Sequence, residues 1–469
     1  MSRWSPESGR LEIATLGRAY RAGELAPEAV IEAVYDRISR RGDDGVWNYL
    51  LPYDEARARV RALGRLPAEA SPVWGIPFSV KDNLDVPGFP TTSGLPESVY
   101  VAATTGPAVS RLMDAGAIPI GKTALDQFAV GLVGIRTRGK SCSSVFHPDY
   151  IPGGSSAGSA VSVAAGLVSF ALGNDAAGSG RVPAALNNIV GIKPTPGLVS
   201  NRAVSGGGVV RSIETISVLA LDCRDGMEVL RLVAGYDPDD AFSRPEADAV
   251  NLSIGTLPLS FAFGVPDDSH LQFLGDTAAA RLFEQAIHRL EEMGGTERRI
   301  DYSPFAEAQK ILYEGPWISE RTAWLEPVIE RHRESLHPVT RSILESGNQY
   351  SAKDLFRAMH RLALLRQKAR MIFRDIDVLL MPTVPTTYTK AEIESDPITL
   401  NARLGIYTNF TNLLGMCAVA VPNGFRPDGL ALGVTFLALE MRDACAATFA
   451  DAYLKKLGLQ TGNFPARRP

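Results

Sequence analysis

The sequence predicts an α/β protein, because segments with the periodicity of a helix alternate along the chain with short apolar runs typical of buried strands. An amphipathic helix is expected from Pro27 until Gly42, followed by a buried strand over residues 75–80. A helix over residues 107–115 then precedes a strand over residues 117–120. Helices that cover a sheet are the arrangement this alternation favours.

The middle of the chain is rich in small residues and continues the same pattern. A helix is expected from Ser155, followed by a strand over residues 168–172 and a glycine-rich turn. Two helical stretches, residues 277–293 and 304–374, precede an apolar strand at residues 378–381. The alternation of helices and strands therefore extends over most of the chain.

Length and composition indicate a globular protein and exclude several classes. The 469 residues, of which 45% are hydrophobic, can bury a large core, although length alone leaves one or two domains open. The balance of 48 Lys and Arg against 52 Asp and Glu leaves a net charge of −4, which does not indicate binding to nucleic acid. The sequence shows neither a signal peptide nor an apolar run of about 18 residues, so we expect a cytoplasmic protein that does not associate with membranes.

The cysteines do not indicate a metal site or a disulfide framework. The four of them are far apart and form no C-x-x-C pair: Cys142, Cys223, Cys417 and Cys445. Such spacing is typical of a protein in a reducing compartment.

One familiar motif favours nucleotide binding, but its context argues against it. Residues 116–123, GAIPIGKT, satisfy the phosphate-loop pattern G-x-x-x-x-G-K-[ST]. A phosphate loop needs a flexible backbone, whereas residues 118–120 predict a strand. We therefore do not favour a nucleotide site.

A second motif indicates a serine hydrolase of another kind. Gly154, Ser156 and Gly158 fit the nucleophile elbow G-x-S-x-G, in which Ser156 would be the nucleophile. That mechanism needs a histidine base, and the five histidines after the elbow lie in helical or acidic surroundings. We therefore do not favour this mechanism.

A third constellation is longer and carries more information. Lys81 ends the strand in GIPFSVKDN, residues 153–160 read GGSSAGSA, and residues 174–184 read NDAAGSGRVPA. Taken singly, a lysine at a strand end is usually a surface residue, and serine-glycine runs are usually caps or turns. In this order, with Ser179 lying 24 residues after Ser155, they resemble the amidase signature family.

This resemblance extends from about Leu11 to about Lys456 and implies a catalytic triad. A serine hydroxyl attacks poorly until a base removes its proton, and a lysine can be that base only if its surroundings lower its pKa. The family pattern implies that Lys81 is the base, that Ser155 relays the proton, and that Ser179 is the nucleophile. It also implies a cis peptide before Ser155, and it implies no metal or organic cofactor.

The family pattern also implies where the oxyanion of the reaction would bind. Backbone N–H groups of the tight turn at Ala176, Ala177, Gly178 and Ser179 would stabilise it, which explains the small side chains there.

Several longer segments resemble the allophanate hydrolases within this family. They are LDQFAVGLVGIRT, AGSGRVPAALNNIVGIKPT, GYDPDDAFSR, LYEGPWISER and NARLGIYTNFTNLL. Allophanate is urea that carries a carboxylate, and the resemblance implies that Tyr313 and Arg321 hold this group. The alternative for this pair is an ordinary amphipathic helix with an exposed arginine.

The resemblance further implies a small-molecule substrate and release of ammonia and N-carboxycarbamate. It also allows a homodimer, for which no residue indicates an interface.

Some positions near the predicted triad depart from the family pattern. Ala124 replaces an asparagine, Asn174 and Ala176 replace two threonines that flank Asp175, and Glu214-Thr215 replaces Asp-Cys. The triad itself is retained, so these changes bear on the substrate. Two alternatives therefore stay open: an enzyme for another small carboxylated amide, and a catalytically silent family member.

The resemblance also implies the overall architecture. We expect residues 1–460 to form a single α/β/α domain with a large mixed sheet covered by helices and a site at the strand ends. Residues 461–469 would form a loose tail, and the C-terminal domain of full-length allophanate hydrolases would be absent. The chain would then perform only the deamidation half of their reaction.

Overall fold

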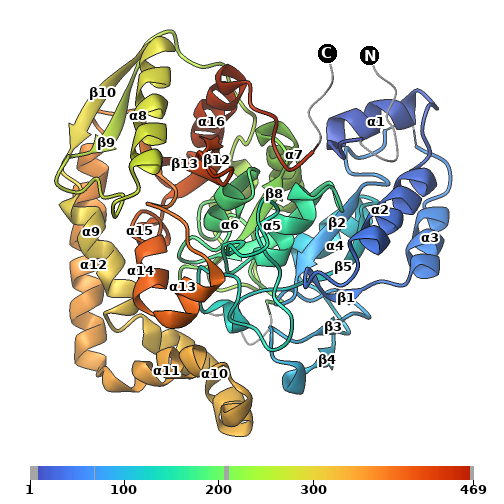
Figure 1. Ribbon diagram of the computed structural model, residues 1–469, viewed down its shortest axis with the longest axis horizontal. Coiled ribbons are helices and arrows are strands. Elements are labelled where there is room, and N and C mark those ends of the chain that lie inside the picture. The colour runs from blue at the N-terminus through green and yellow to red at the C-terminus, as the bar shows by residue number, and fades with distance from the viewer. Residues whose placement is uncertain (1–8, 68, 205–210, 465–469) are drawn as a thin grey trace.

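An eleven-stranded mixed sheet runs through the computed structural model, which describes residues 9–67, 69–204 and 211–464 (Figure 1). The strands in spatial order are β1 (Trp47–Leu50), β5 (Ile118–Thr123), β2 (Pro77–Lys81), β6 (Phe170–Asp175), β8 (Thr215–Ala220), β7 (Val190–Lys193), β12 (Cys417–Phe425), β13 (Ala431–Ala438), β11 (Val378–Pro382), β9 (Phe261–Pro266) and β10 (Gly295–Ile300). Strand β2 is parallel to both β5 and β6, whereas β8 is antiparallel to β6 and β7. The predicted single domain with a mixed sheet is confirmed.

Helices surround this sheet. They are α1 (Ile13–Arg21), α2 (Pro27–Arg41), α3 (Tyr53–Ala62), α4 (Pro107–Asp114), α5 (Ala157–Ala164), α6 (Arg181–Leu186), α7 (Cys223–Val233), α8 (Thr277–Glu292), α9 (Ser303–Tyr313), α10 (Ile318–His332), α11 (Pro338–Ser346), α12 (Ala352–Ile372), α13 (Lys390–Ser395), α14 (Thr399–Leu404), α15 (Phe410–Leu413) and α16 (Asp443–Leu457). Helices α9 to α12 gather on one side of the molecule, while α1 to α3 lie at the opposite side (Figure 1). A small ribbon, β3 (Pro90–Thr91) with β4 (Tyr100–Val101), lies apart from the main sheet.

The local patterns of the sequence give most element positions correctly. Helix α2 begins at Pro27 and is capped at its end by Gly42, whose φ of 66° is one that glycine adopts without strain. Strand β6 begins two residues later than expected and continues through Gly173 to Asp175. Its polar end is fully buried, which the apolar run alone does not indicate; β8 pairs with it as far as Asp175, whereas the pairing with β2 ends at Leu172.

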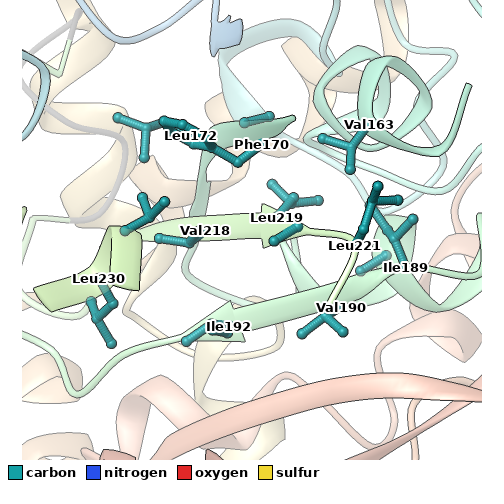
Figure 2. Close-up of a cluster of buried hydrophobic side chains, with 14 of the residues drawn as sticks. Val163, Phe170, Leu172, Ile189, Val190, Ile192, Val218, Leu219, Leu221 and Leu230 are labelled. Atoms are coloured by element: carbon teal, nitrogen blue, oxygen red, sulfur yellow. The ribbon is translucent and has the colours of Figure 1, made fainter. Parts of the chain in front are cut away.

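The centre of the core lies where β6, β8 and β7 meet helices α5 and α7. Figure 2 shows Phe170 and Leu172 of β6, Leu219 of β8, Val163 of α5 and Leu230 of α7 packed in one cluster. All five side chains are excluded from solvent. This packing makes the central strands a rigid support for the residues at their ends.

The predicted loose tail is wrong for its first residues. The Arg10 guanidinium donates to the Thr461 carbonyl at 2.8 Å and to its hydroxyl at 2.7 Å, and the Gly462 N–H donates to the Asn188 carbonyl at 2.7 Å. The same guanidinium lies over the ring of Phe464, 5.2 Å from its centroid. An apolar ring and satisfied backbone groups therefore fix this segment, while residues 465–469 lie outside the described residues.

Within the described ranges, no helix is both long enough and apolar enough to cross a lipid bilayer.

We expect the central strands to carry much of the stability of the fold. Replacing Leu219, which is 0% exposed, by Ala should lower the free energy of unfolding by about 2–5 kcal/mol, because it leaves a cavity in the core. The matched control is Leu259→Ala, since Leu259 is 98% exposed and should change it by less than about 0.5 kcal/mol. Urea unfolding followed by circular dichroism measures both, and equal effects would contradict the assignment of this core.

Candidate active site

Three neighbouring strands bring polar residues to one end of the sheet. Strand β2 ends at Lys81 and runs parallel to β6, with Val80 opposite Leu172. Strand β8 is antiparallel to β6, with Thr215 opposite Asp175. The last residue of β2, the last residues of β6 and the residue before β8 therefore converge.

Lys81 and Ser155 are joined as the sequence predicts. The Lys81 amine donates to Ser155 Oγ at 2.6 Å, and both side chains are fully buried. The peptide bond between Gly154 and Ser155 is cis, and the Ser155 carbonyl accepts the Asp126 N–H at 3.2 Å. The serine of the GGSS loop is thus held against the lysine by side-chain and backbone contacts.

The surroundings of Lys81 make its neutral form accessible. Burial lowers the pKa of Lys81 from 10.5 to about 7, although the carboxylates of Glu214, Asp126 and Asp175 oppose this shift. The Arg321 guanidinium, a like charge, lowers this pKa further. An amine with this pKa can accept a proton near neutral pH, which an ordinary lysine cannot.

The turn that carries Ser179 is organised by the carboxylate of Asp175. Its Oδ1 accepts the Gly178 N–H at 2.8 Å, its Oδ2 accepts the Gly180 N–H at 3.1 Å, and Arg181 donates to both oxygens. Burial alone would raise the pKa of Asp175, but the charge of Arg181 keeps it below its usual value. Gly178 has a φ of 122°, and a Cβ there would lie 2.4 Å from Thr408 Oγ1, so the turn requires glycine.

This turn lies against the GGSS loop. The carbonyl of Ser179 accepts the N–H of Ser156 at 3.1 Å, and Ser179 is almost completely buried. Within the described residues, the hydroxyls of Ser155 and Ser179 are not joined by a hydrogen bond. The structure therefore brings the three predicted residues to one place, and joins two of them directly.

One of the predicted oxyanion donors is already occupied. The N–H of Gly178 donates to Asp175, so it cannot also point at a substrate oxygen. In the described part of the chain, the N–H groups of Ala176, Ala177 and Ser179 have no acceptor. The prediction is thus corrected for Gly178, whose function is to shape the turn.

Tyr313 and Arg321 come from two successive helices, at the end of α9 and in the first turns of α10. Arg321 is only 2% exposed, so it is not the exposed helix arginine of the alternative interpretation. It donates from Nη1 to the Ala129 carbonyl at 3.1 Å, whereas its buried Nε has no partner among the described residues. Tyr313 is partly buried, and no bond within the described chain joins it to Arg321.

Sequence reasoning missed the function of several buried residues. The Asp126 carboxylate accepts the N–H groups of Gly134 and Arg136, each at 2.9 Å, and so shapes the loop next to Gly154. The Asn412 amide donates to the carbonyl of Asp175 at 2.7 Å. No motif marks these residues, because their partners lie in other segments.

Two of the departures from the family pattern are linked to the site, Asn174 directly and Glu214 through Asn174. Lys81 donates to Asn174 Oδ1, and Asn174 Nδ2 donates to Glu214 Oε1. The sequence showed that these residues were unusual, but only the pairing of β6 with β8 makes them neighbours.

The two competing motifs have structural explanations. Lys122 of the phosphate-loop pattern lies inside strand β5, pairs with Asp82 at 3.1 Å and donates to Thr91 Oγ1 at 2.8 Å. Ser156 of the elbow pattern is buried at the start of α5, and its hydroxyl donates to the Asn174 carbonyl at 3.2 Å. Both residues are thus committed to the fold.

Among the described residues, no group of three or more His, Cys, Asp or Glu side chains is arranged to hold a metal ion.

Comparison with known proteins identifies the class of the protein. The model of the amidase family matches residues 29–445 of this chain. The chain therefore belongs to the amidase family, and it is an amidohydrolase, an enzyme that acts on amide C–N bonds.

The relatives align with this chain over different shares of their own length. Urea amidolyase of Saccharomyces cerevisiae is 36% identical over 432 residues, which is 91% of this chain but only 23% of that protein. The A subunit of glutamyl-tRNA(Gln) amidotransferase from Acidobacterium capsulatum is 31% identical over 471 residues, 93% of this chain and 97% of that protein. The solved structure of Kluyveromyces lactis allophanate hydrolase is 32% identical, with a TM-score of 0.91 over 99% of this chain and 76% of that chain.

The burial of Lys81 predicts the pH dependence of the enzyme. If neutral Lys81 is the base, kcat/KM should rise with pH, about tenfold per unit below the pKa, and level off above a pKa of about 7. Initial rates of amide hydrolysis measured between about pH 5.5 and about pH 9.5 test this. A rate that still rises above about pH 9 would indicate a lysine with an ordinary pKa and would contradict the expectation.

Proposed function

We propose that this enzyme hydrolyses a small amide or urea derivative through Lys81, Ser155 and Ser179, and that its substrate is allophanate, urea-1-carboxylate. The observation that carries the reaction is the 2.6 Å hydrogen bond between Lys81 Nζ and Ser155 Oγ in a fully buried site. The substrate is supported by the similarity to the allophanate hydrolase of Kluyveromyces lactis and by the buried guanidinium of Arg321.

The first half of the reaction forms an acyl-enzyme. Neutral Lys81 accepts the proton of Ser155, while Ser155 takes the proton of Ser179. Ser179 Oγ attacks the carbonyl carbon, and the oxyanion that forms accepts hydrogen bonds from the N–H groups of Ala176 and Ala177. The Lys81 ammonium then returns its proton through Ser155 to the leaving nitrogen, the C–N bond breaks, and ammonia departs.

The second half releases the acid. A water molecule attacks the ester carbonyl on Ser179 and gives a proton to Ser155 and Lys81 in the same way. The bond to Ser179 then breaks, and the serine recovers its proton. With allophanate the acid released is N-carboxycarbamate, so this chain performs the deamidation step.

The carboxylate of the substrate needs a cationic partner inside the buried site. Arg321 fits this function because its Nε lacks a partner among the described residues and its charge is close enough to lower the pKa of Lys81. A bound carboxylate would accept a charge-assisted hydrogen bond from this guanidinium. We propose that the Tyr313 hydroxyl is the second donor to the same group.

The proposed reaction is tested by ammonia release from allophanate, with biuret, malonamate and urea in parallel. The unsubstituted chain should release ammonia from allophanate, whereas Ser179→Ala should lose at least about a thousandfold in kcat, because no nucleophile remains. The matched control is Ser156→Ala, which removes the same atoms from the neighbouring serine and should retain activity within about tenfold.

The pattern of substrates separates the chemistry from the substrate assignment. If allophanate is inert but another amide is hydrolysed through Ser179, the triad stands and the assignment to allophanate fails. If no amide is hydrolysed and a fluorophosphonate probe does not label Ser179 in folded protein, the chain is a catalytically silent member of the family.

Arg321 should affect substrate binding more than turnover. At a pH high enough for Lys81 to be neutral in both enzymes, Arg321→Gln should raise KM for allophanate about 30-fold or more with a small change in kcat, because it removes a buried charge-assisted contact with the carboxylate. The matched control is Arg331→Gln on the exposed face of α10, which should leave KM unchanged. An unchanged KM in the Arg321 variant would remove the carboxylate site from the proposal.

A second candidate function is glutamine hydrolysis within an amidotransferase. It is favoured by the match to the glutamyl-tRNA(Gln) amidotransferase of Acidobacterium capsulatum, which extends over 97% of that relative. An enzyme of this kind would hydrolyse glutamine in preference to allophanate, so glutamine belongs in the substrate panel.

A homodimer stays a prediction that sedimentation can test.

A further inference from the structure

A chain of two hydrogen bonds leads from the catalytic centre into the protein. Lys81 Nζ donates to Asn174 Oδ1, and Asn174 Nδ2 donates to Glu214 Oε1. None of these three side chains is more than 1% exposed. The mechanism described above uses neither Asn174 nor Glu214.

The sheet determines this arrangement. Lys81 ends β2, Asn174 lies near the end of β6, and Glu214 directly precedes β8, and these three strands are adjacent. The Glu214 segment is further anchored, because its carbonyl accepts the Asn201 amide at 2.6 Å. The three side chains therefore lie in a row across the strand ends.

An asparagine suits the middle position chemically. Its amide presents an acceptor oxygen to the amine and donor hydrogens to the carboxylate, and the two groups are rigidly joined. A threonine, usual here in the family pattern, has one oxygen for both contacts and a shorter side chain. Asn174 therefore couples the amine of Lys81 to the charge of Glu214.

The other two carboxylates that act on Lys81 bind groups of their own loops. Asp175 is neutralised by Arg181 at 2.9 Å, and Asp126 accepts three backbone N–H groups of its own loop. Of the three carboxylates that act on this amine, Glu214 is the one that extends toward it through a side chain bonded to both.

We propose that Glu214, acting through Asn174, is a positioning residue that sets the basicity of Lys81 and holds its amine against Ser155. The proposal rests on the proposed function, in which Lys81 is the base. When Lys81 takes the proton, the buried ammonium forms beside a carboxylate that already faces it through the amide. The charged intermediate state is thus stabilised without rearrangement of the site.

The electrostatics of the site are consistent with this function. Glu214 is the strongest of the charges that raise the pKa of Lys81 against the effect of burial; Asp126 and Asp175 act in the same direction and Arg321 in the opposite one. Removing the charge of Glu214 should therefore lower the pKa of Lys81, and the neutral base should exist at lower pH.

The pH dependence of Ser179 labelling by a fluorophosphonate probe tests the proposal without a known substrate. In Glu214→Gln the acidic limb of the labelling rate should shift to lower pH by about one unit or more, because a nearby opposite charge shifts a pKa by about one to three units. The labelling rate at high pH should fall, since the base is weaker. A change that affected only folding would not move the limb.

Three further variants test whether Glu214 acts on Lys81 through Asn174. Glu320→Gln removes a neighbouring carboxylate that binds Ser212 instead of the lysine chain, and the limb should not move. Glu214→Asp keeps the charge but shortens the reach to Asn174, so its limb should lie between those of the unsubstituted chain and of Glu214→Gln. In Asn174→Thr the limb should move in the same direction as in Glu214→Gln, and adding Glu214→Gln should add little, because the link is already broken.

The outcomes separate this proposal from the function on which it rests. Suppose that Ser179 is labelled in the unsubstituted chain, but that the acidic limb of folded Glu214→Gln stays in place or shifts to higher pH. That result would overturn the role of Glu214 alone. No labelling in the unsubstituted chain would overturn the triad and the role of Glu214 with it. If Glu214→Gln does not fold, the labelling rate of Asn174→Thr is measured instead. An acidic limb at the same pH as in the unsubstituted chain would overturn the proposal.

Discussion

The contact between the buried amine of Lys81 and the hydroxyl of Ser155 is the constraint on which the site depends. Burying an ammonium away from solvent costs free energy, and this cost falls only when hydrogen-bonding or charged partners surround the group. Here the partners are one hydroxyl, one amide and the charges of several buried carboxylates. Because burial and these charges act in opposite directions, the amine can change its protonation state near neutral pH.

Two buried aspartates organise the backbone on either side of this contact. Asp126 accepts the N–H groups of the loop that leads to Gly154, and Asp175 accepts those of the turn that carries Ser179. Each carboxylate replaces the solvent that an irregular segment would otherwise need for its N–H groups. The two serines of the site therefore lie on loops whose backbone is fixed from within the protein.

In the proposed function, chemistry and recognition come from different parts of the fold. The strand ends carry Lys81 and the turn of Ser179, whereas Arg321 comes from α10, in the group of helices on one side of the sheet (Figure 1). Such a division allows relatives that share the sheet to differ in substrate, as the similarity to both a urea amidolyase and an amidotransferase illustrates. In the proposed function, the changes at Asn174 and Glu214 act on the base Lys81 and leave the reaction class intact.

The sequence by itself determined the α/β class and the extent of elements such as α2, because periodicity and turn residues are local properties of a chain. Its resemblance to the amidase signature family implied the candidate residues Lys81, Ser155 and Ser179. Only the tertiary structure decided that the Gly178 N–H is occupied, that Arg321 is buried and that residues 461–464 are anchored. It also decided that Asn174 links Lys81 to Glu214. The physical reason is that each of these features depends on a partner from another segment, and the partners are set by the order in which strands β2, β6 and β8 pair and by the helices packed over them.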